Sequence, residues 1–346
     1  MRSCIALFVV LILAGSATCA AQSTGRIEFE GLVQAHFVWQ QGEISGAGCG
    51  GDSACYDDRS YSSYGLGAAR LRVKAKATER ISGQFTLDAS RSPVVLDAYV
   101  DVFLKTWASF RAGQFMLPYG FENYIERFNL MTGTRSLIAH HLWDNGVSAP
   151  YLRDIGLMFK GKYSLFNYEV AQVNGAGFDY TTDASDGLVG WGRDNNNCKD
   201  YVGRVWMGVP LFAGLGFSMY RGKWVDDQKR DSWALDLYLD TGKLIFQTEY
   251  ERGHGVMLDG LWSDTDHCGY HILIGYRFIP LLEGLYRYDK FDPTRGAIQD
   301  TMTDHYAGVN LNFMRSAKLQ VSYVWRSEKP VPLSNDRFQA FMSAKF

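Results

Sequence analysis

Apolar and polar side chains alternate with a period of two along much of this 346-residue chain. In residues 27–40 the apolar side chains fall mostly on odd positions and the polar ones mostly on even positions. The alternation recurs over residues 64–78, where Leu71 stands between Arg70 and Arg72. A helix would spread such residues over all its faces, whereas a strand sorts them onto two. The pattern therefore predicts strands with one apolar and one polar face.

The same test applied to the whole chain predicts about sixteen strands. They span residues 27–40, 64–78, 81–90, 94–105, 107–116, 153–162, 165–174, 199–209, 214–222, 232–240, 243–251, 268–278, 282–290, 304–313, 317–327 and 336–346. Long and short connections alternate between them, as in outer-membrane barrels, where short periplasmic turns alternate with longer extracellular loops. The predicted fold is all-β: a transmembrane antiparallel β-barrel of about 16 strands, with long extracellular loops and short periplasmic turns.

Both ends of the chain fit export to a bacterial outer membrane. Residues 1–20 carry one Arg, then an apolar run and small residues, which is typical of a secretory signal peptide. We expect cleavage near Ala20 and a single barrel domain over residues 21–346. The final strand alternates and ends on Phe346, which resembles the signal that outer-membrane insertion machinery recognises. The expected surroundings are outer-membrane lipid and lipopolysaccharide.

Composition supports this interpretation and excludes one class of partner. Aromatic residues make up 14% of the chain, with 36 Gly and only 8 Pro, which suits many strands joined by turns. Mean hydropathy is −0.17, because a barrel alternates its apolar residues instead of clustering them. The formal charge is −2, and loss of Arg2 with the signal peptide makes it −3. So small a net charge argues against nucleic acid as a partner.

Four of the six cysteines remain after the signal region, at positions 49, 55, 198 and 268. Because exported compartments are oxidising, disulfides are the first expectation for Cys49, Cys55, Cys198 and Cys268. Cys49 and Cys55 lie in one Gly-rich segment and would close a short loop. Cys198 and Cys268 could pair only if the fold brings them together. A metal site is the alternative, but the chain has no CxxC or suitable His spacing.

A barrel of this size encloses a water-filled lumen, so its function depends on what narrows that lumen. The predicted third extracellular connection, residues 117–152, is long and amphipathic, and we expect it to fold inward as a constriction. Irregular backbone is permitted there because water can satisfy it. The alternative is that this segment packs outside, as a cap or as a latch between protomers.

Basic residues on lumen-facing positions, or in and beside the long connection, predict a path for anions. Four of them follow one another on alternate positions of a single strand, with no acidic residue between, and would attract anions along that strand. Inward-facing acidic residues such as Asp88, Asp97 and Asp101 leave open the alternative of no strong preference. The residues expected along the anion path are Arg70, Arg72, Lys74, Lys76, Arg111, Arg127, Arg135, Arg153 and Lys160.

Three short motifs in the middle of the chain resemble a known family. Residues 113–122 (GQFMLPYGFE), then Arg135-Ser136-Leu137, then residues 153–158 (RDIGLM) are similar in order and spacing to the phosphate-selective porin O and P family. The resemblance implies a sixteen-stranded trimeric channel that prefers polyanions. The chain departs from the family at Gln114, where a basic residue is common, and this affects the expected phosphate specificity more than the fold.

The sequence thus predicts a passive channel for small solutes, with a preference for anions such as phosphate, assembled as a homotrimer. A structural or adhesive barrel with a closed lumen is the alternative, followed by an outer-membrane enzyme that modifies lipids. The chain contains no HExxH, GxSxG or phosphate-binding glycine loop, and none of its histidines is part of a Ser nucleophile motif. We therefore expect no enzymatic activity, no cofactor and no bound metal.

Overall fold

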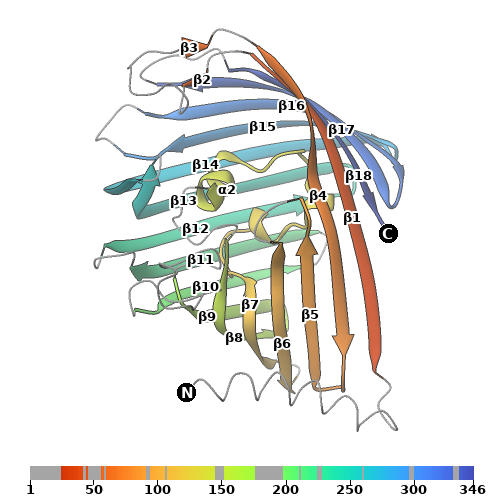
Figure 1. Cartoon of the computed structure of the whole chain (residues 1–346), viewed down its shortest axis with the longest axis vertical. Coiled ribbons are helices and arrows are strands. Elements are labelled where there is room, and N and C mark those ends of the chain that lie inside the picture. Colours follow the sequence, from red (N-terminus) through yellow and green to blue (C-terminus); the bar gives the residue numbers. More distant parts are fainter. Residues whose placement is uncertain are drawn as a thin grey trace, which may run out of the picture.

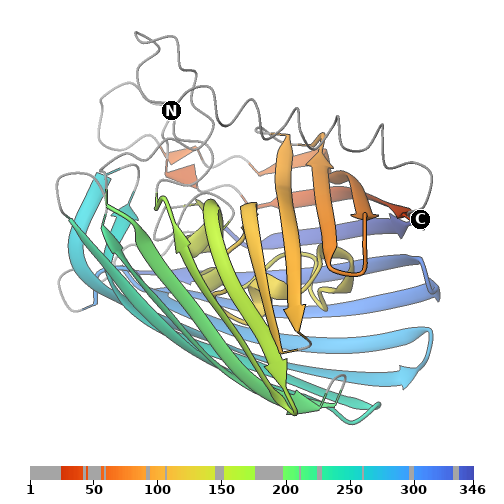
Figure 2. The same ribbon diagram turned by 90° about the horizontal axis from the view of Figure 1, so that it is seen from below.

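The computed structural model describes residues 25–41, 44–45, 56–57, 60–90, 94–105, 107–144, 152–175, 198–209, 212–223, 228–258, 261–295, 300–329 and 335–346. Within these residues sixteen strands form one closed antiparallel barrel (Figures 1 and 2). From β4 onward each strand pairs with the next along the chain. The barrel closes through β1, which pairs with β4 on one side and with β18 on the other.

The barrel strands coincide closely with those predicted from the alternation. They are β1 (Arg26–Gln40), β4 (Tyr61–Lys76), β5 (Ile81–Asp88), β6 (Val95–Lys105), β7 (Ala108–Met116), β8 (Arg153–Tyr163), β9 (Phe166–Val173), β10 (Asp200–Val209), β11 (Ala213–Lys223), β12 (Lys229–Asp240), β13 (Leu244–Leu258), β14 (Leu261–Ile279), β15 (Leu282–Asp292), β16 (Met302–Met314), β17 (Ala317–Glu328) and β18 (Arg337–Lys345). Two further short strands, β2 (Ile44–Ser45) and β3 (Tyr56–Asp57), pair with each other inside the connection between β1 and β4. The predicted fold class is confirmed.

One predicted connection is wrong. Residues 252–267 were expected to form a long loop, but β13 and β14 continue through them as a hairpin. The polar residues that indicated a loop instead pair across the two strands. Arg252 donates to Asp266 at 3.0 Å, and the ring nitrogens of His254 lie 2.9 Å from Asp264 and 3.0 Å from Asp266. Because these cross-strand charge pairs satisfy one another, the ladder extends beyond its apolar part.

The barrel carries its apolar residues on the outside, the reverse of a soluble protein. On β1, Ile27 is 62% exposed and Phe29 is 68% exposed. Polar side chains take the buried positions of the wall, as Gln34 and Ser343 do where β1 meets β18 and hydrogen-bond to each other at 3.0 Å. The odd-numbered apolar residues of the first strand therefore point outward, as their alternation requires.

A β-bulge at Gly67 interrupts the alternation on β4. The register between β1 and β4 shifts between Gln34 and Ala35, so Gly67 is an extra residue on β4. Leu66 and Leu71 are both exposed on the outer surface, one at an even and one at an odd position. A bulge of this kind reverses which face each position occupies and leaves the bulged residue outside the regular ladder. The uniform alternation expected over residues 64–78 is therefore broken at one point.

The seam where the barrel closes depends on a glycine. The backbone N–H of Gly31 donates to the carbonyl of Phe346 at 2.6 Å, and the N–H of Phe346 returns a bond at 3.1 Å. A Cβ added at Gly31 would lie 2.2 Å from the Phe346 ring. The absence of a side chain at Gly31 therefore makes room for the Phe346 ring, which packs over the backbone there.

Residues 117–144, here called the inner segment, pass from β7 into the interior of the barrel (Figures 1 and 2). They contain two 3₁₀ turns, η1 (Glu122–Tyr124) and η2 (Arg127–Asn129), and one helix, α2 (Leu137–Asp144). Leu117, Tyr119 and Ile138 are buried in an apolar cluster with inward-facing residues of the wall, including Val202 and Phe291. In the described part of the chain, no helix is both long and apolar enough to cross a membrane.

Candidate functional site

A cavity of about 350 Å³ lies between the inner segment and the wall formed by β4 to β9. We call it the basic cavity, because seven basic and three acidic side chains line it. Seven of the nine residues predicted for the anion path are among them: Arg70, Arg72 and Lys74 from β4, Arg111 from β7, Arg153 from β8, and Arg127 and Arg135 from the inner segment. The acidic residues are Asp97, Glu126 and Glu169.

The basic residues of β4 do not form an uncompensated ladder. Three of the four are paired with carboxylates, which the sequence pattern on one strand could not show. The contacts are Arg70 to Asp88 at 2.8 Å, Arg72 to Glu30 at 2.9 Å and to Glu126 at 2.8 Å, and Lys74 to Glu30 at 2.6 Å. The fourth residue, Lys76, is exposed near the end of the strand and lines a different cavity. The positive field along β4 is therefore reduced by its own counter-charges.

Asp101 on β6 lines the neighbouring cavity and binds two basic side chains. Arg111 donates two hydrogen bonds to this carboxylate, at 2.8 and 2.9 Å, and Lys160 donates a third at 3.2 Å. The Arg111 guanidinium also stacks on Tyr99, 3.6 Å from the ring centroid. Nearby, Arg153 is held by Asp97 at 2.8 Å. These contacts fix the planar guanidinium groups in defined orientations, as recognition of oxyanions requires.

Two arginines of the inner segment are held by backbone carbonyls. Arg127 donates to the carbonyl of Gly67, the extra residue of the β-bulge. Arg135 donates to the carbonyl of Glu122 and, at 2.8 Å, to that of Ile125. These contacts to uncharged carbonyls fix where the two guanidinium groups lie. The bulge thus supplies an acceptor that a regular ladder would have used between strands.

Glu126 is the acidic residue that the inner segment places in the basic cavity. Its carboxylate lies 2.8 Å from Arg72 and 3.1 Å from Lys345 on β18. Burial alone would raise the pKa of Glu126, but the contacts with Arg72 and Lys345 outweigh it and hold the pKa below its usual value. Glu126 is therefore ionised at neutral pH and partly offsets the positive charge around it.

The basic cavity adjoins two larger ones toward the ends of the strands that the short turns connect. A cavity of about 600 Å³ shares Lys74, Gln84 and Tyr99 with it and also contains Lys76. A third, of about 520 Å³, shares Glu169 and contains Lys160. The two predicted residues outside the basic cavity are thus in its neighbours. The three cavities therefore lie next to one another along the inner wall.

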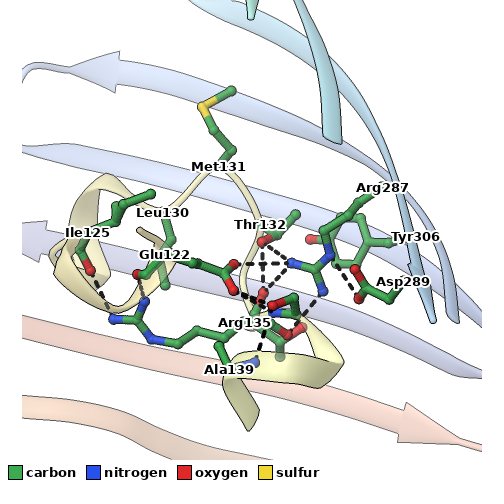
Figure 3. A network of polar contacts seen from close by, with 12 residues as sticks. Glu122, Ile125, Leu130, Met131, Thr132, Arg135, Ala139, Arg287, Asp289 and Tyr306 are labelled. Atoms are coloured by element: carbon green, nitrogen blue, oxygen red, sulfur yellow. Dashed lines mark hydrogen bonds and ion pairs between the residues drawn. The ribbon is translucent and has the colours of Figure 1, made fainter. Parts of the chain in front are cut away.

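Arg287 on β15 anchors the inner segment to the far wall (Figure 3). Its guanidinium donates to the Thr132 hydroxyl at 2.6 Å and to the carbonyls of Thr134 and Arg135 at 2.8 and 3.0 Å. Asp289 accepts from its Nε at 3.0 Å. These bonds attach the second half of the inner segment to the wall opposite the basic cavity.

The beginning of the inner segment is anchored by β11 and β13. The Ser218 hydroxyl accepts from the N–H of Gly120 at 3.1 Å. The Glu249 carboxylate accepts from the N–H groups of Phe121 and Glu122 at 2.8 and 3.1 Å. Gly120 has a φ of +70°, and a Cβ there would lie 2.5 Å from Glu249. Only glycine fits this turn without strain.

The predicted cysteine pairing has no counterpart in the described residues. Cys268 on β14 carries a thiol, so it is not bonded to Cys198, which lies just before β10. Three strands separate β10 from β14 around the barrel. Cys49 and Cys55 lie outside the described residues.

Four residues of the site were not predicted from the sequence: Glu30, Tyr99, Glu126 and Arg287. Arg287 occupies an inward position on β15, and its parity could have indicated this. Its contact with residues 132–135 could not be predicted, because the two segments are more than 150 positions apart. The same holds for Glu126 and Lys345.

Comparison with solved structures places the fold among outer-membrane porins. The OmpF complex with daunomycin from Salmonella typhi is 12% identical, with a TM-score of 0.66 over 92% of this chain and 97% of that chain. The outer-membrane channel DcaP of Acinetobacter baumannii is 11% identical, with a TM-score of 0.65 over 93% and 97%. In-vitro folded OmpT of Vibrio cholerae, in its trimer form, is 12% identical, with a TM-score of 0.55 over 93% and 99%.

At such low identity these similarities establish the architecture alone, a closed sixteen-stranded antiparallel barrel of the outer-membrane porin type. No protein-family model matches the chain, and no similar curated protein is found. The resemblance to the phosphate-selective porin O and P family is therefore supported as far as the porin fold and is not confirmed for that particular family.

Proposed function

We propose that this chain is an outer-membrane porin, a passive diffusion channel that favours small anions such as phosphate. The basic cavity is the observation that carries the proposal. Seven basic side chains and three acidic ones surround a space of about 350 Å³ between the inner segment and the wall. A small hydrated anion entering this space gains attraction that a cation does not, because low-dielectric walls focus the local charge.

The internal ion pairs define how strong this preference can be. Arg72 and Lys74 share Glu30, and Arg111 and Lys160 share Asp101. An arriving anion must compete with these carboxylates, so the cavity favours weak, exchangeable contacts. Weak contacts suit a channel, because conduction requires that a solute leave as readily as it enters. We accordingly propose anion preference rather than tight binding of one solute.

In this proposal the inner segment forms the constriction. Residues 1–20 act as the signal peptide, and residues 21–346 form the membrane-embedded domain. Outer-membrane lipid and lipopolysaccharide surround the apolar outer surface, on which Ile27 and Phe29 are exposed. We also propose a homotrimer, an assembly named for one of the structurally similar proteins. We assign the channel no reaction and no cofactor.

Reversal potentials test the anion preference directly. The purified protein is reconstituted in planar bilayers and measured in a salt gradient, beside a variant in which Arg70, Arg72, Lys74 and Lys76 are all changed to Gln. The parental channel should be anion-selective. The variant should shift toward cations, because Asp88 and Glu30 lose their basic partners and remain in the wall. Equal reversal potentials for the two proteins would show that the β4 residues do not set selectivity.

The second candidate is a structural or adhesive barrel with a closed lumen. The apolar cluster between the inner segment and the wall favours it, because it fills part of the interior with Leu117, Tyr119 and Ile138. The same bilayer recording separates the two functions. Discrete ion-selective current steps support the channel, whereas electrical silence from a correctly folded barrel supports the closed structure. Release of fatty acid from the bilayer lipid would instead indicate the lipid-modifying enzyme.

A further inference from the structure

We propose that Arg287 is a positioning residue for selectivity: it holds residues 132–135 so that the Arg135 side chain reaches the basic cavity. This inference rests on the proposed channel function. Arg287 does not line the basic cavity itself. It would act through the inner segment, from the wall on the other side of that segment.

The guanidinium of Arg287 hydrogen-bonds to the backbone of the inner segment (Figure 3). The residue is 2% exposed. Its Nη1 donates to the Thr134 carbonyl at 2.8 Å and its Nη2 to the Arg135 carbonyl at 3.0 Å. Two carbonyl acceptors on one planar fork fix both the distance and the direction of the chain. Its Nε is in turn oriented by Asp289.

Neighbouring wall residues hold the preceding part of the inner segment in the same way. Lys318 on β17 donates to the Leu130 carbonyl at 2.7 Å, and Asn310 on β16 donates to the Met131 carbonyl at 2.8 Å. Gln320 donates to both carbonyls, at 3.1 and 3.0 Å. These wall contacts are made to main-chain carbonyls. The wall therefore specifies where the backbone lies, and Arg287 provides the final attachment before the side chain of Arg135.

Arg135 connects the two sides of the inner segment. Its carbonyl is bound by Arg287, while its guanidinium extends away to the carbonyls of Glu122 and Ile125 and lines the basic cavity. Figure 3 shows the two guanidinium groups on either side of Glu122. Without Arg287, residues 132–135 lose three hydrogen-bond donors, one of them to the carbonyl of Arg135. The charge of Arg135 would then lie on average farther from the route of an anion.

The test must separate position from charge, because removing Arg287 alone leaves Asp289 without this ion pair and takes one of two arginines away from Glu122. A double variant, Arg287→Met with Asp289→Asn, removes one charge of each sign. We expect its anion-to-cation permeability ratio to fall about sixfold, because moving a unit charge from roughly 4 to 8 Å in water disfavours the anion and favours the cation, each by a factor of about 2.4. The matched control is Arg277→Met with Asp240→Asn, a partly buried pair of the wall, whose two bonds of 2.7 and 2.9 Å do not involve the inner segment. Its ratio should remain parental.

A double-mutant cycle gives a readout that a merely structural role would not produce. In an Arg135→Gln background, the Arg287→Met/Asp289→Asn change should leave the permeability ratio unaltered, because the group that Arg287 positions is already gone. Arg287→Lys keeps the charge but replaces the fork by a single ammonium, and its ratio should lie between parental and double variant. Heat-modifiable gel mobility shows whether each variant forms a folded barrel. If the double variant does not fold, the selectivity of Arg287→Lys alone decides the test.

Two outcomes overturn the inference. One is a folded double variant, or a folded Arg287→Lys variant, with parental selectivity. The other is an equal loss of selectivity from the Arg287 change with and without Arg135. Failure of the proposed function looks different, because the parental protein would then show no anion-selective current at all.

Discussion

Glu126 offers the sharpest single test of how the basic cavity works. Its carboxylate is the acidic group that the inner segment inserts among the basic residues, between Arg72 and Lys345. Glu126→Gln keeps the size and the hydrogen-bonding oxygen of the side chain while removing one negative charge. If attraction between charges sets selectivity, the variant should prefer anions more strongly than the parental channel.

The size of the effect follows from Coulomb's law. An anion about 6 Å from the lost carboxylate is relieved of roughly 0.7 kcal/mol of repulsion in a water-like medium and roughly 3 kcal/mol at an effective dielectric of about 20. The Glu126 side chain is 22% exposed, so its surroundings are partly wet. We take the lower figure, which corresponds to a gain of about threefold for the anion. A cation loses an equal attraction, so the anion-to-cation permeability ratio should rise about tenfold. Salt screens such a charge, so most of the gain should vanish at about 1 M salt, where the Debye length is about 3 Å.

Reversal potentials in gradients centred near 0.1 M and near 1 M salt measure both parts of this expectation. Glu328→Gln is the control, because Glu328 lies at the end of β17, is 21% exposed and does not line the basic cavity. Its selectivity should match the parental protein at both concentrations. The reasoning is refuted if Glu126→Gln forms normal channels whose selectivity at low salt equals that of the control.

Two further predictions concern stability. Gly31→Val should lower the yield of heat-modifiable folded barrel after refolding, because its side chain would collide with the Phe346 ring, and adding Phe346→Ala should restore part of that yield. Arg230→Met should destabilise the barrel by about 3–5 kcal/mol, because it leaves the carboxylate of Asp200 buried and without its 2.5 Å ion pair. Denaturant titration in detergent micelles, followed by tryptophan fluorescence, measures this loss. A parental midpoint for Arg230→Met would contradict the second of these.

The barrel could be predicted in detail because the alternation of apolar and polar residues is visible within each strand's own sequence. Apolar side chains at alternate positions, such as Ile27 and Phe29, show which residues share a face, and a barrel in a membrane turns that face outward. Predictions from the alternation were wrong at two places, where something other than periodicity determined the structure. The bulge at Gly67 reverses the faces of β4, and the charges of Arg252 and Asp266 continue a ladder that polarity alone suggested had ended.

The site was predicted less completely, for a related reason. The basic residues could be found because their positions along a strand set the direction in which they point. Their partners could not, because Glu30 and Arg72 are 42 positions apart, and Glu126 meets Lys345 only when the inner segment crosses the barrel. Pairing across a closed barrel depends on register and on the course of the segment inside it. Neither the register nor the course of the inner segment can be read from the local sequence.

The seam between β1 and β18 has a consequence for how this molecule is built. The contact between Gly31 and Phe346 joins positions more than 300 residues apart. Until that contact forms, both terminal strands present unpaired backbone groups. Lipid cannot hydrogen-bond to them, whereas the edge of another chain can. Pairings so distant along a chain are slow to form. Assembly must therefore keep two open edges away from other chains until the pairing of β1 with β18 completes the ring.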